Sequence, residues 1–521
     1  MNMPLQRLAA AAFLLFACPG AQAATLTMGV AVDTTSLDPH YHNIQFNHSI
    51  DEQIFDPLTY QDAGGAVVPW LAESWRQVND DTWEFRLRPG VTFHDGTRLD
   101  PDDVAFSFRR LGAIASPSPL THYIETIAGY ERIDDRNFRL RTHGPSPTLP
   151  LDLSAVPILS RMLHKDATTA DFNSGKAAIG TGAYRLVRYA RGDAIELERN
   201  PNWWGPAQPW DRVLMRPIPN DGARLAALLS GDVDLIDRVS PDDLPRLRVD
   251  PALQVFSVRA LQVLYLFPDT SRDTLPLTFD KAGRPLPTNP TRDARVREAI
   301  SLSINRGAIA ERVMQSAGFP AEQMVAPGAI GRDETLSQPA YDPARARALL
   351  AQAGYPNGWA WTLVGPKGMY QNDDKVAQAI AQMLTRVGIE TKVDVLIPAN
   401  FYARINAREF PIFMTGYLNA SAVITLRSLV VSKESGPGNG ALNRMAYRNP
   451  DFDRLFLAVA KDPDDARRAR GLAASMRMII EDHALIPIIY TANNWVARRD
   501  RVVYTPNVMG FTQAMSARPA P

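Results

Sequence analysis

The sequence predicts an α/β protein, in which helices cover a β-sheet. Two observations carry this prediction. Along the chain, two kinds of segment alternate: some have apolar residues at every second position, as strands do, and others carry helix start and stop signals. After the amino-terminal region, the chain has no apolar run of transmembrane length, no low-complexity tract and no short-period repeat. We therefore expect a soluble globular protein.

The first well-defined elements are a strand and a helix between residues 82 and 113. Trp83, Phe85 and Leu87 fall on one face of the strand, and turn residues follow it. Asp100 then caps a helix that has Pro101 at its first position and acidic residues in its first turn. No catalytic group is needed to explain these residues, so we assign them an architectural role.

Further elements alternate in the same manner. Residues 183–189 and 194–197 are expected to form strands around a turn, and residues 222–229 a helix that ends near Gly231. Residues 271–292, rich in Pro and Thr, are expected to form a long surface loop.

The second half of the sequence continues the pattern. Asp342 is expected to cap a helix, and a second helix near Asp373 stops at Gly388. Residues 389–395 then alternate as a strand.

The amino terminus predicts an exported protein. Arg7 precedes the apolar run 8–17, and residues 21–23 (AQA) match a signal-peptide cleavage site. The run is too short to span a bilayer. Cys18 offers an alternative lipoprotein site, but the bulky Phe16 before it fits such a site poorly. Residues 1–23 are therefore expected to be a cleaved signal peptide.

Removal of residues 1–23 would leave 498 residues with 55 basic and 56 acidic side chains. This length suggests about two to four domains. The near-zero net charge disfavours nucleic acid or an anionic membrane surface as a partner. Cys18 is the only cysteine, so a chain cleaved after Ala23 would contain no disulfide and no cysteine nucleophile.

Several motifs occur in the same order as in a known family. They are LDPH at 37–40, PWLAESW at 69–75, TWEFRLRPGVTFHDG at 82–96, DPDDVAFSF at 100–108, GTGAY at 180–184, RNPNWWG at 199–205, SGDVD at 230–234, VREAI at 296–300 and AGYP at 353–356. Together they resemble the peptide-binding class of bacterial extracellular solute-binding proteins, the dipeptide, oligopeptide and nickel receptors of ABC importers. The resemblance covers almost the whole chain after the signal peptide.

This resemblance implies a two-lobed periplasmic-binding-protein fold with a hinge. Lobe I would comprise residues 24–262, with an extra subdomain at about 61–178, and lobe II residues 263–488; residues 489–521 would return to lobe I. Two strands would cross between the lobes, near residues 263–267 and 485–490.

The resemblance also implies a periplasmic receptor. It would be a monomer that captures peptides or peptide-like solutes between its lobes and delivers them to the permease and ATPase subunits of an importer. Opines, glycosides and chelated metals are alternative ligands.

Catalytic and nucleotide-binding signatures are absent from the sequence. There is no H-E-x-x-H, G-x-S-x-G or Walker motif, and no pair of acids stands out for hydrolysis. We therefore expect neither an enzyme nor a cofactor, with an exported hydrolase as the less favoured alternative.

Three histidines near the amino terminus suggest a metal site, because His40, His42 and His48 lie within nine residues. However, His40 belongs to the LDPH motif, and no acidic or thiolate cluster completes a coordination shell. We expect no metal site. By family position, His48 is expected to line the ligand pocket, although a surface or core role is equally compatible with the sequence.

The second-lobe segment that usually binds a peptide's amino group differs here. Family members carry an aspartate in a segment that begins Gly-Trp, whereas residues 416–421 (GYLNAS) contain no acid. A buried ammonium without a partner would cost several kcal/mol. Asn419 could accept one neutral hydrogen bond. Arg427 could offer its planar donor fork to a carboxylate or phosphate, with a solvated helix position as the alternative.

Further ligand contacts are expected from Thr35, Lys367, Tyr370 and Tyr417. Lys367 lies close to where dipeptide receptors place a carboxylate-binding arginine, and the two tyrosines could form pocket walls or belong to the core. With Lys367 and Arg427 as the charged groups of the second lobe, the ligand is expected to present an anionic or neutral polar group there.

Export without a lipid anchor is directly testable. Amino-terminal sequencing of the exported protein should give a terminus at Ala24 or within a residue of it, because the small residues before it suit signal peptidase. Recovery of a lipidated Cys18 from the membrane fraction would contradict this prediction.

Overall fold

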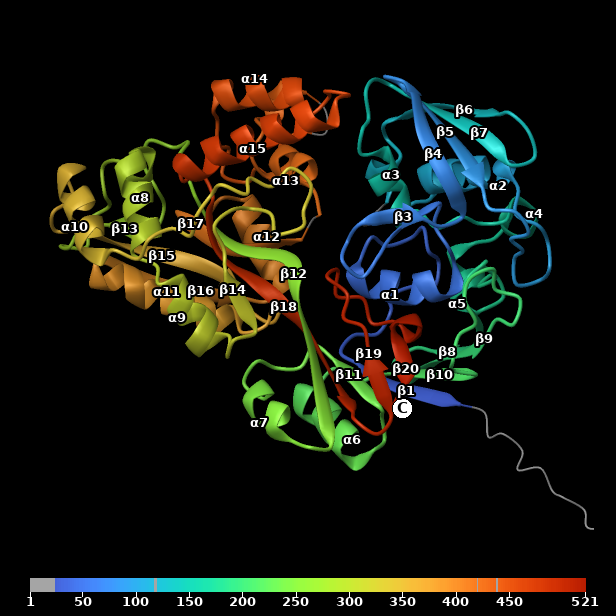
Figure 1. Ribbon diagram of the computed structural model, residues 1–521. Coiled ribbons are helices and arrows are strands. Elements are labelled where there is room, and N and C mark those ends of the chain that lie inside the picture. Colours follow the sequence, from blue (N-terminus) through green and yellow to red (C-terminus); the bar gives the residue numbers. More distant parts are fainter. Residues whose placement is uncertain (1–23, 117–119, 419, 437–438) are drawn as a thin grey trace, which may run out of the picture.

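The computed structural model describes residues 24–116, 120–418, 420–436 and 439–521. The α/β class is confirmed. Figure 1 shows two lobes joined by the long strands β12 (Leu253–Pro268) and β18 (Ile486–Arg498). The predicted signal peptide and Asn419 lie outside the described residues. Within the described part, no helix is both long and apolar enough to cross a bilayer.

The first lobe is built on a sheet around the amino-terminal strand. Its elements outside the added subdomain are β1 (Thr25–Val30), α1 (Gln45–Ile54), β8 (Tyr184–Ala190), β9 (Ala194–Arg199), β10 (Arg212–Pro217), α6 (Asp221–Ser230), β11 (Leu235–Asp237), α7 (Leu244–Val249), β19 (Val502–Tyr504) and β20 (Ala517–Pro519). β1 pairs in parallel with β10 and β11, and its Leu26 and Met28 are fully buried in the core of this lobe. The helix predicted before Gly231 is α6, which ends as expected because Gly231 adopts a left-handed conformation (φ 84°).

A four-stranded antiparallel sheet forms the core of an added subdomain, in the order β4-β5-β7-β6. The elements of this region are β2 (Thr59–Gln61), β3 (Val67–Pro69), β4 (Ala72–Asn79), β5 (Thr82–Leu87), α2 (Pro101–Ala113), β6 (Ile127–Arg132), β7 (Asn137–Thr142), α3 (Leu149–Asp152), α4 (Arg161–His164) and α5 (Thr169–Asn173). The predicted alternation is confirmed, because Trp83, Phe85 and Leu87 of β5 are all buried. The Phe85 ring stacks on Phe138 of β7, with 5.5 Å between centroids.

Helices surround the sheet of the second lobe. Its elements are β13 (Thr278–Phe279), α8 (Ala294–Leu302), α9 (Arg306–Ala308), β14 (Gly318–Pro320), α10 (Pro343–Gln352), β15 (Trp359–Pro366), α11 (Asp373–Arg386), β16 (Ile389–Leu396), α12 (Pro398–Asn406), β17 (Ile412–Leu418), α13 (Ala422–Leu429), α14 (Pro450–Val459) and α15 (Asp465–Glu481). The expected loop at 271–292 contains the two-residue strand β13, which pairs with β15. Short 3-10 turns lie at Thr121–Tyr123, Leu153–Ala155, Pro290–Arg292, Lys433–Ser435 and Ala514–Ser516, and a π-helical turn at Ile309–Val313.

One sheet runs through both lobes, with β12 and β18 at its centre. Its main path is β13-β15-β17-β12-β18-β11-β1-β10-β9-β8, so β17 continues it into the second lobe and β11 into the first. The first half of β12 pairs with the second half of β18, and the later part of β12 pairs with both β18 and β17. The register between β12 and β18 is shifted between Arg259 and Val263 and again between Leu264 and Tyr265. Both strands are longer than the short crossings expected from the sequence.

Two predicted helix caps are confirmed by hydrogen bonds. The Asp100 side chain accepts from the Asp102 N–H, while the Asp103 side chain accepts from the Asp100 N–H, which completes a capping box on α2. Asp342 accepts from the Arg345 N–H at the start of α10.

A buried carboxylate connects the added subdomain to the rest of the first lobe. Asp56, which is 1% exposed, accepts hydrogen bonds from Trp70 Nε1 at 2.7 Å, Trp204 Nε1 at 3.1 Å and Thr181 Oγ1 at 2.8 Å. Burial raises the pKa of Asp56, and these donors oppose that rise. The three donors come from well-separated parts of the sequence, so Asp56 fixes their relative positions.

Replacing this carboxylate should therefore destabilise the protein. We expect Asp56→Ala to lower the free energy of unfolding by about 2–4 kcal/mol, because it leaves buried donors without an acceptor. Urea titration followed by fluorescence measures the change. The control is Asp166→Ala, at a side chain that is 87% exposed, where a change within about 0.5 kcal/mol is expected. Equal effects of the two substitutions would contradict the proposed role of Asp56.

Candidate functional site

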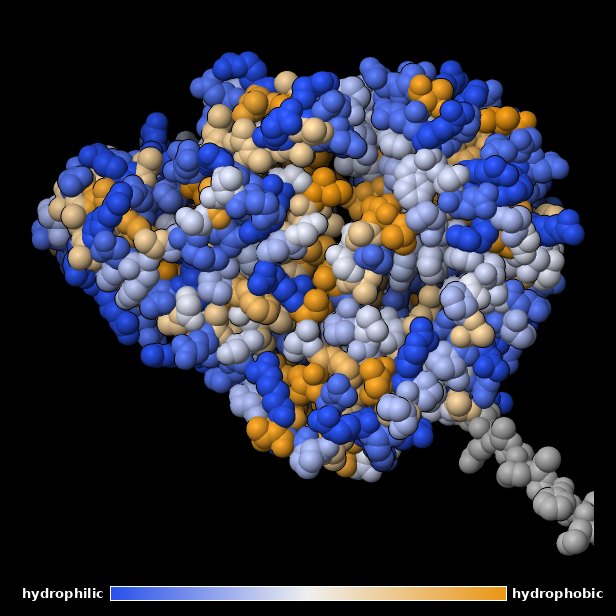
Figure 2. All heavy atoms as spheres, in the orientation of Figure 1, coloured by the Kyte–Doolittle hydropathy of each residue, from blue (hydrophilic) through white to orange (hydrophobic). Residues whose placement is uncertain are grey.

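Two adjoining cavities lie where the lobes meet. The larger has a volume of about 250 Å³ and the smaller about 70 Å³, and Gln45 and Leu418 belong to the walls of both. On the face shown in Figure 2, a hollow separates the two lobes and hydrophobic residues gather beside it. Together the two cavities form one cleft, which we call the interlobe cleft.

The larger cavity is lined from both lobes. Its wall consists of Asn43, Gln45, His48, Glu52, Gln61, Tyr123, Leu151, Asp152, Ser154, Ala155, Leu418, Ala420, Ile424, Met509 and Phe511. Gln45, His48 and Glu52 are spaced by three and four residues along α1, and this spacing places them on one face of the helix.

His48 is a neutral member of this wall. It is 8% exposed, its Nε2 lies 3.0 Å from Asn43 Oδ1, and its ring lies 5.9 Å from that of Phe511. Burial lowers the pKa of His48 to about 4. The imidazole therefore offers a hydrogen bond without a positive charge at neutral pH.

Two acids lie in the wall of the larger cavity. Glu52 accepts a hydrogen bond from Gln513 Nε2 at 2.6 Å, and Asp152 accepts one from Thr148 Oγ1 at 3.2 Å. Burial raises the pKa of Glu52 to about 8 and that of Asp152 to about 7. Arg427 of α13, in the second lobe, opposes the rise at Asp152. Neither acid forms an ion pair with another described residue.

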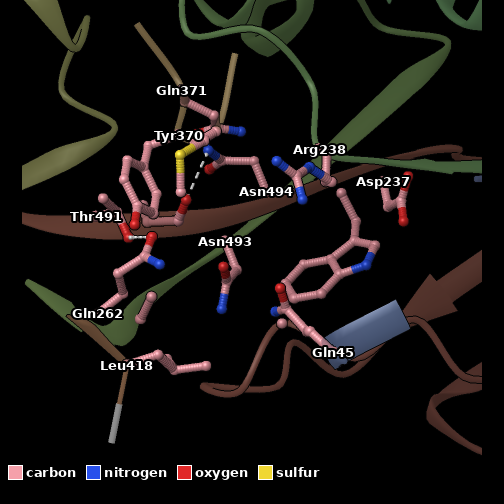
Figure 3. A pocket seen from close by; sticks show the side chains of 15 residues that line it. Gln45, Asp237, Arg238, Gln262, Tyr370, Gln371, Leu418, Thr491, Asn493 and Asn494 are labelled. Carbon is pink, nitrogen blue, oxygen red and sulfur yellow. Dashed lines mark hydrogen bonds between the residues drawn. The ribbon is translucent and has the colours of Figure 1, made fainter. Parts of the chain in front are cut away.

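The smaller cavity has a mainly polar wall, shown in Figure 3. Thr491 Oγ1 donates to Gln262 Oε1 at 3.2 Å, which connects β18 to β12. Tyr370 donates through its hydroxyl to the Gly416 carbonyl at 3.1 Å. The remaining side chains include the amides of Gln45, Gln371, Asn493 and Asn494 and the charged pair Asp237 and Arg238.

The sequence-predicted residues occupy different places. His48 lines the larger cavity and Tyr370 the smaller one. Arg427 is partly buried close to the larger cavity, and burial lowers its pKa while Asp152 opposes this effect. The ligand contacts of all three stay predictions.

Of the other predicted residues, the described ones (Thr35, Lys367 and Tyr417) are not part of either wall. Thr35 is exposed, and its hydroxyl lies 2.6 Å from His42 Nδ1. Lys367 is exposed, and Tyr417 is half-buried, so that burial raises its pKa. Asn419 lies outside the described residues. His40, from the histidine group, is buried with Nε2 at 2.9 Å from the Pro157 carbonyl, which gives it a structural role.

Of the residues in the two walls, the sequence predicts only His48 and Tyr370. The others include Gln45, Glu52, Asp152 and Arg238. A signal existed for the first two, because they share a helical face with His48. Asp152 and Arg238 are brought to the cleft by long-range folding, for which the sequence offers no local signal.

The fold and the cleft are those of a solute-binding protein with two lobes. A family model described as bacterial extracellular solute-binding proteins, family 5 Middle, matches residues 66–423. Since this is more than half of the chain, the chain belongs to that family, which consists of solute-binding proteins.

The chain is similar to proteins with different ligands. It is 26% identical over 502 residues to heme-binding protein A of Haemophilus influenzae, covering 89% of this chain and 85% of the relative. It is 24% identical over 456 residues to the dipeptide-binding protein of Escherichia coli, covering 81% and 80%. The periplasmic binding protein DppA from Helicobacter pylori, solved with the peptide STSA, has the same fold, with a TM-score of 0.75, 22% identity and coverage of 95% and 98%.

The raised pKa of Glu52 predicts a pH-dependent stability. Because it lies above the ordinary 4.5, the folded protein binds more protons than the unfolded chain up to a pH of about 8. Stability therefore falls as the pH rises through this window. Gln513 and Tyr60 donate to Glu52 and oppose the rise in its pKa, whereas Asp56 adds to it.

We expect Glu52→Gln to remove this contribution. In thermal unfolding scans between pH 5 and pH 9, the melting temperature of the variant should increase relative to wild type as the pH rises. Glu125→Gln, at an exposed position, is the control and should follow the wild-type profile. If Glu52→Gln also follows that profile, Glu52 is ionised in the folded protein throughout the range.

Proposed function

We propose that this protein is the periplasmic substrate-binding component of an ABC importer. It captures peptides or peptide-like solutes in the interlobe cleft and delivers them to the permease. The observation that carries this proposal is a polar cleft to which both lobes contribute, in a member of a solute-binding family. The similarity to a dipeptide-binding protein supports peptides as the ligand class.

In the proposed organisation, lobe I comprises residues 24–262 with an extra subdomain at about 61–178. Lobe II comprises residues 263–488, and residues 489–521 return to lobe I.

A peptide bound in the interlobe cleft contacts both lobes only when they are closed, and its binding therefore shifts the population from open to closed forms. A bound peptide would pair its backbone with exposed strand edges, which provides affinity with limited side-chain preference.

The lobes already touch beside the smaller cavity. Lys375 Nζ of α11 lies 2.5 Å from Asp242 Oδ2, and Gln371 Nε2 donates to the Val239 carbonyl at 3.1 Å. The Lys375–Asp242 pair is half-exposed, so it contributes at most about 1 kcal/mol. Contacts of this strength permit opening, and a ligand is needed to make the closed form dominant.

Native mass spectrometry with a pool of di- and tripeptides tests the function. The protein should retain peptides from the pool and release them unchanged, whereas a hydrolase would return fragments. A chaperone would instead bind unfolded chains. Retention of an opine, glycoside or metal chelate in place of peptides would replace the proposed ligand class.

The closure mechanism makes a separate prediction. Small-angle X-ray scattering should give a smaller radius of gyration for the saturated complex than for the ligand-free protein. An unchanged radius at saturation would contradict closure without affecting the binding result.

A further inference from the structure

The interlobe cleft has ionisable side chains at both ends. Glu52 and Asp152 lie in the wall of the larger cavity, and Arg238 lies beside Asp237 in the wall of the smaller one. Gln45 and Leu418 stand between them, because both cavities share these two residues. A ligand that occupies the whole cleft therefore meets two acids at one end and, at the other, the Arg238 guanidinium with Asp237 next to it.

Arg238 is available to a ligand. Its guanidinium lies over the Phe46 ring, 5.1 Å from the centroid, and makes no hydrogen bond or ion pair with other described residues. The neighbouring Asp237 carboxylate already accepts from the Ala31 N–H at 2.8 Å and from Thr512 Oγ1 at 3.0 Å. Burial lowers the pKa of Arg238, which reflects the cost of holding this cation away from water. A ligand carboxylate would offset that cost.

The backbone of Arg238 supports the same role. Its φ of 47° is in the left-handed region, which non-glycine residues rarely adopt. Such strain persists where the surrounding structure holds a side chain in a required position. Figure 3 shows Arg238 in the cavity wall together with Asn493, Asn494 and Gln45.

The dipole of helix α1 favours the same placement of ligand charges. Its first residue, Gln45, lies at the shared part of the cleft, and Glu52 lies near its carboxyl end. The helix dipole favours an anion at the first turn and a cation at the last. Ile44 at the N-cap provides no side-chain acceptor, so the first turn is not already neutralised by a capping group.

The length of α1 sets the separation of the two ends. Seven residues separate Gln45 from Glu52, which corresponds to a rise of about 10 Å in an α-helix. An extended peptide spans about 3.3–3.6 Å per residue, so about three residues cover this distance.

We propose that the interlobe cleft binds an extended zwitterion about three residues long. Its carboxylate lies at Arg238 and the first turn of α1, and its ammonium lies between Glu52 and Asp152. This inference rests on the proposed peptide-binding function and adds the ligand's length and orientation. It supplies from the first lobe the acids that are missing from residues 416–418 and 420–421 of the second lobe.

This arrangement differs from an anion site at Lys367 and Arg427. Lys367 is exposed outside both cavity walls, whereas Arg427 interacts with Asp152. The Asp152 carboxylate keeps free acceptor capacity, because the only hydrogen bond that it accepts within the described residues comes from Thr148 Oγ1. A ligand ammonium beside Asp152 could donate a hydrogen bond to this carboxylate.

The test uses blocked ligands on the wild-type protein, so it does not depend on the folding of any variant. Native mass spectrometry with a pool of natural tripeptides identifies a bound peptide. Calorimetry then compares that peptide with its N-acetylated and C-amidated forms. Each block should weaken binding by at least about tenfold, as expected for the loss of a charge-assisted hydrogen bond.

Variants then assign each end of the ligand. In Arg238→Met, the unmodified peptide should bind at least about tenfold more weakly, and C-amidation should have little further effect. In Glu52→Gln and Asp152→Asn, N-acetylation of the peptide should have little further effect on binding, whereas C-amidation should still weaken it. Matched controls are Arg444→Met, whose guanidinium lies 5.4 Å from the centroid of the Tyr402 ring outside the cleft, and Asp51→Asn at a buried position outside both cavity walls. Both controls should keep the wild-type affinity.

The outcomes separate the two proposals. If no peptide from the unmodified pool binds, the proposed peptide function is wrong, and the inference is rejected with it. If a peptide binds and its blocked forms bind equally well, the function stands and the zwitterion site is wrong. If the effect of C-amidation is abolished by Lys367→Ala or Arg427→Ala and not by Arg238→Met, the orientation proposed here is reversed.

Discussion

The pairing of β12 with β18 is the constraint on which the rest of the molecule depends. These strands pass between the lobes, and a single hydrogen-bonded sheet continues from them on both sides. The cleft lies along this pair, since Gln262 comes from β12 and residues 491–495 from β18. Side chains of the two lobes therefore meet at positions set by backbone hydrogen bonds.

The cleft contains ionisable groups that a purely structural interface would not retain. Glu52 and Asp152 have raised pKa values because they are buried without a cation in direct contact, and the Arg238 guanidinium lies near Asp237 without a hydrogen bond to a described residue. Among the described residues outside the cleft, some buried charges are paired: Asp38 and Arg110 form an ion pair of 2.6 Å that is closed to solvent on the aspartate side. Others are not, since the buried Asp51 has a carboxylate oxygen without a hydrogen bond. The groups of the cleft differ from Asp51 because they line cavities that a ligand can enter.

Local sequence patterns predicted the fold better than the site. The alternation of Trp83, Phe85 and Leu87 and the Asp100 cap depend on neighbouring residues, so the sequence reveals them directly. His48 and Tyr370 were also placed near the cleft by family position. Lys367 shows what the sequence could not predict about the site, because a position near the end of a strand does not determine whether the side chain points into the cleft or into solvent. Arg238 could not be identified, since its role depends on contacts between α1 and β11 that are distant in sequence.

The interruption in the strand register has a mechanical consequence. The ladder between β12 and β18 is shifted between Arg259 and Val263 and again between Leu264 and Tyr265, whereas it is regular from Leu253 to Arg259. Bending there disrupts fewer interstrand hydrogen bonds than bending elsewhere along the two strands. The connection between the lobes is thus expected to bend most readily along this irregular stretch of β12, whatever ligand occupies the cleft.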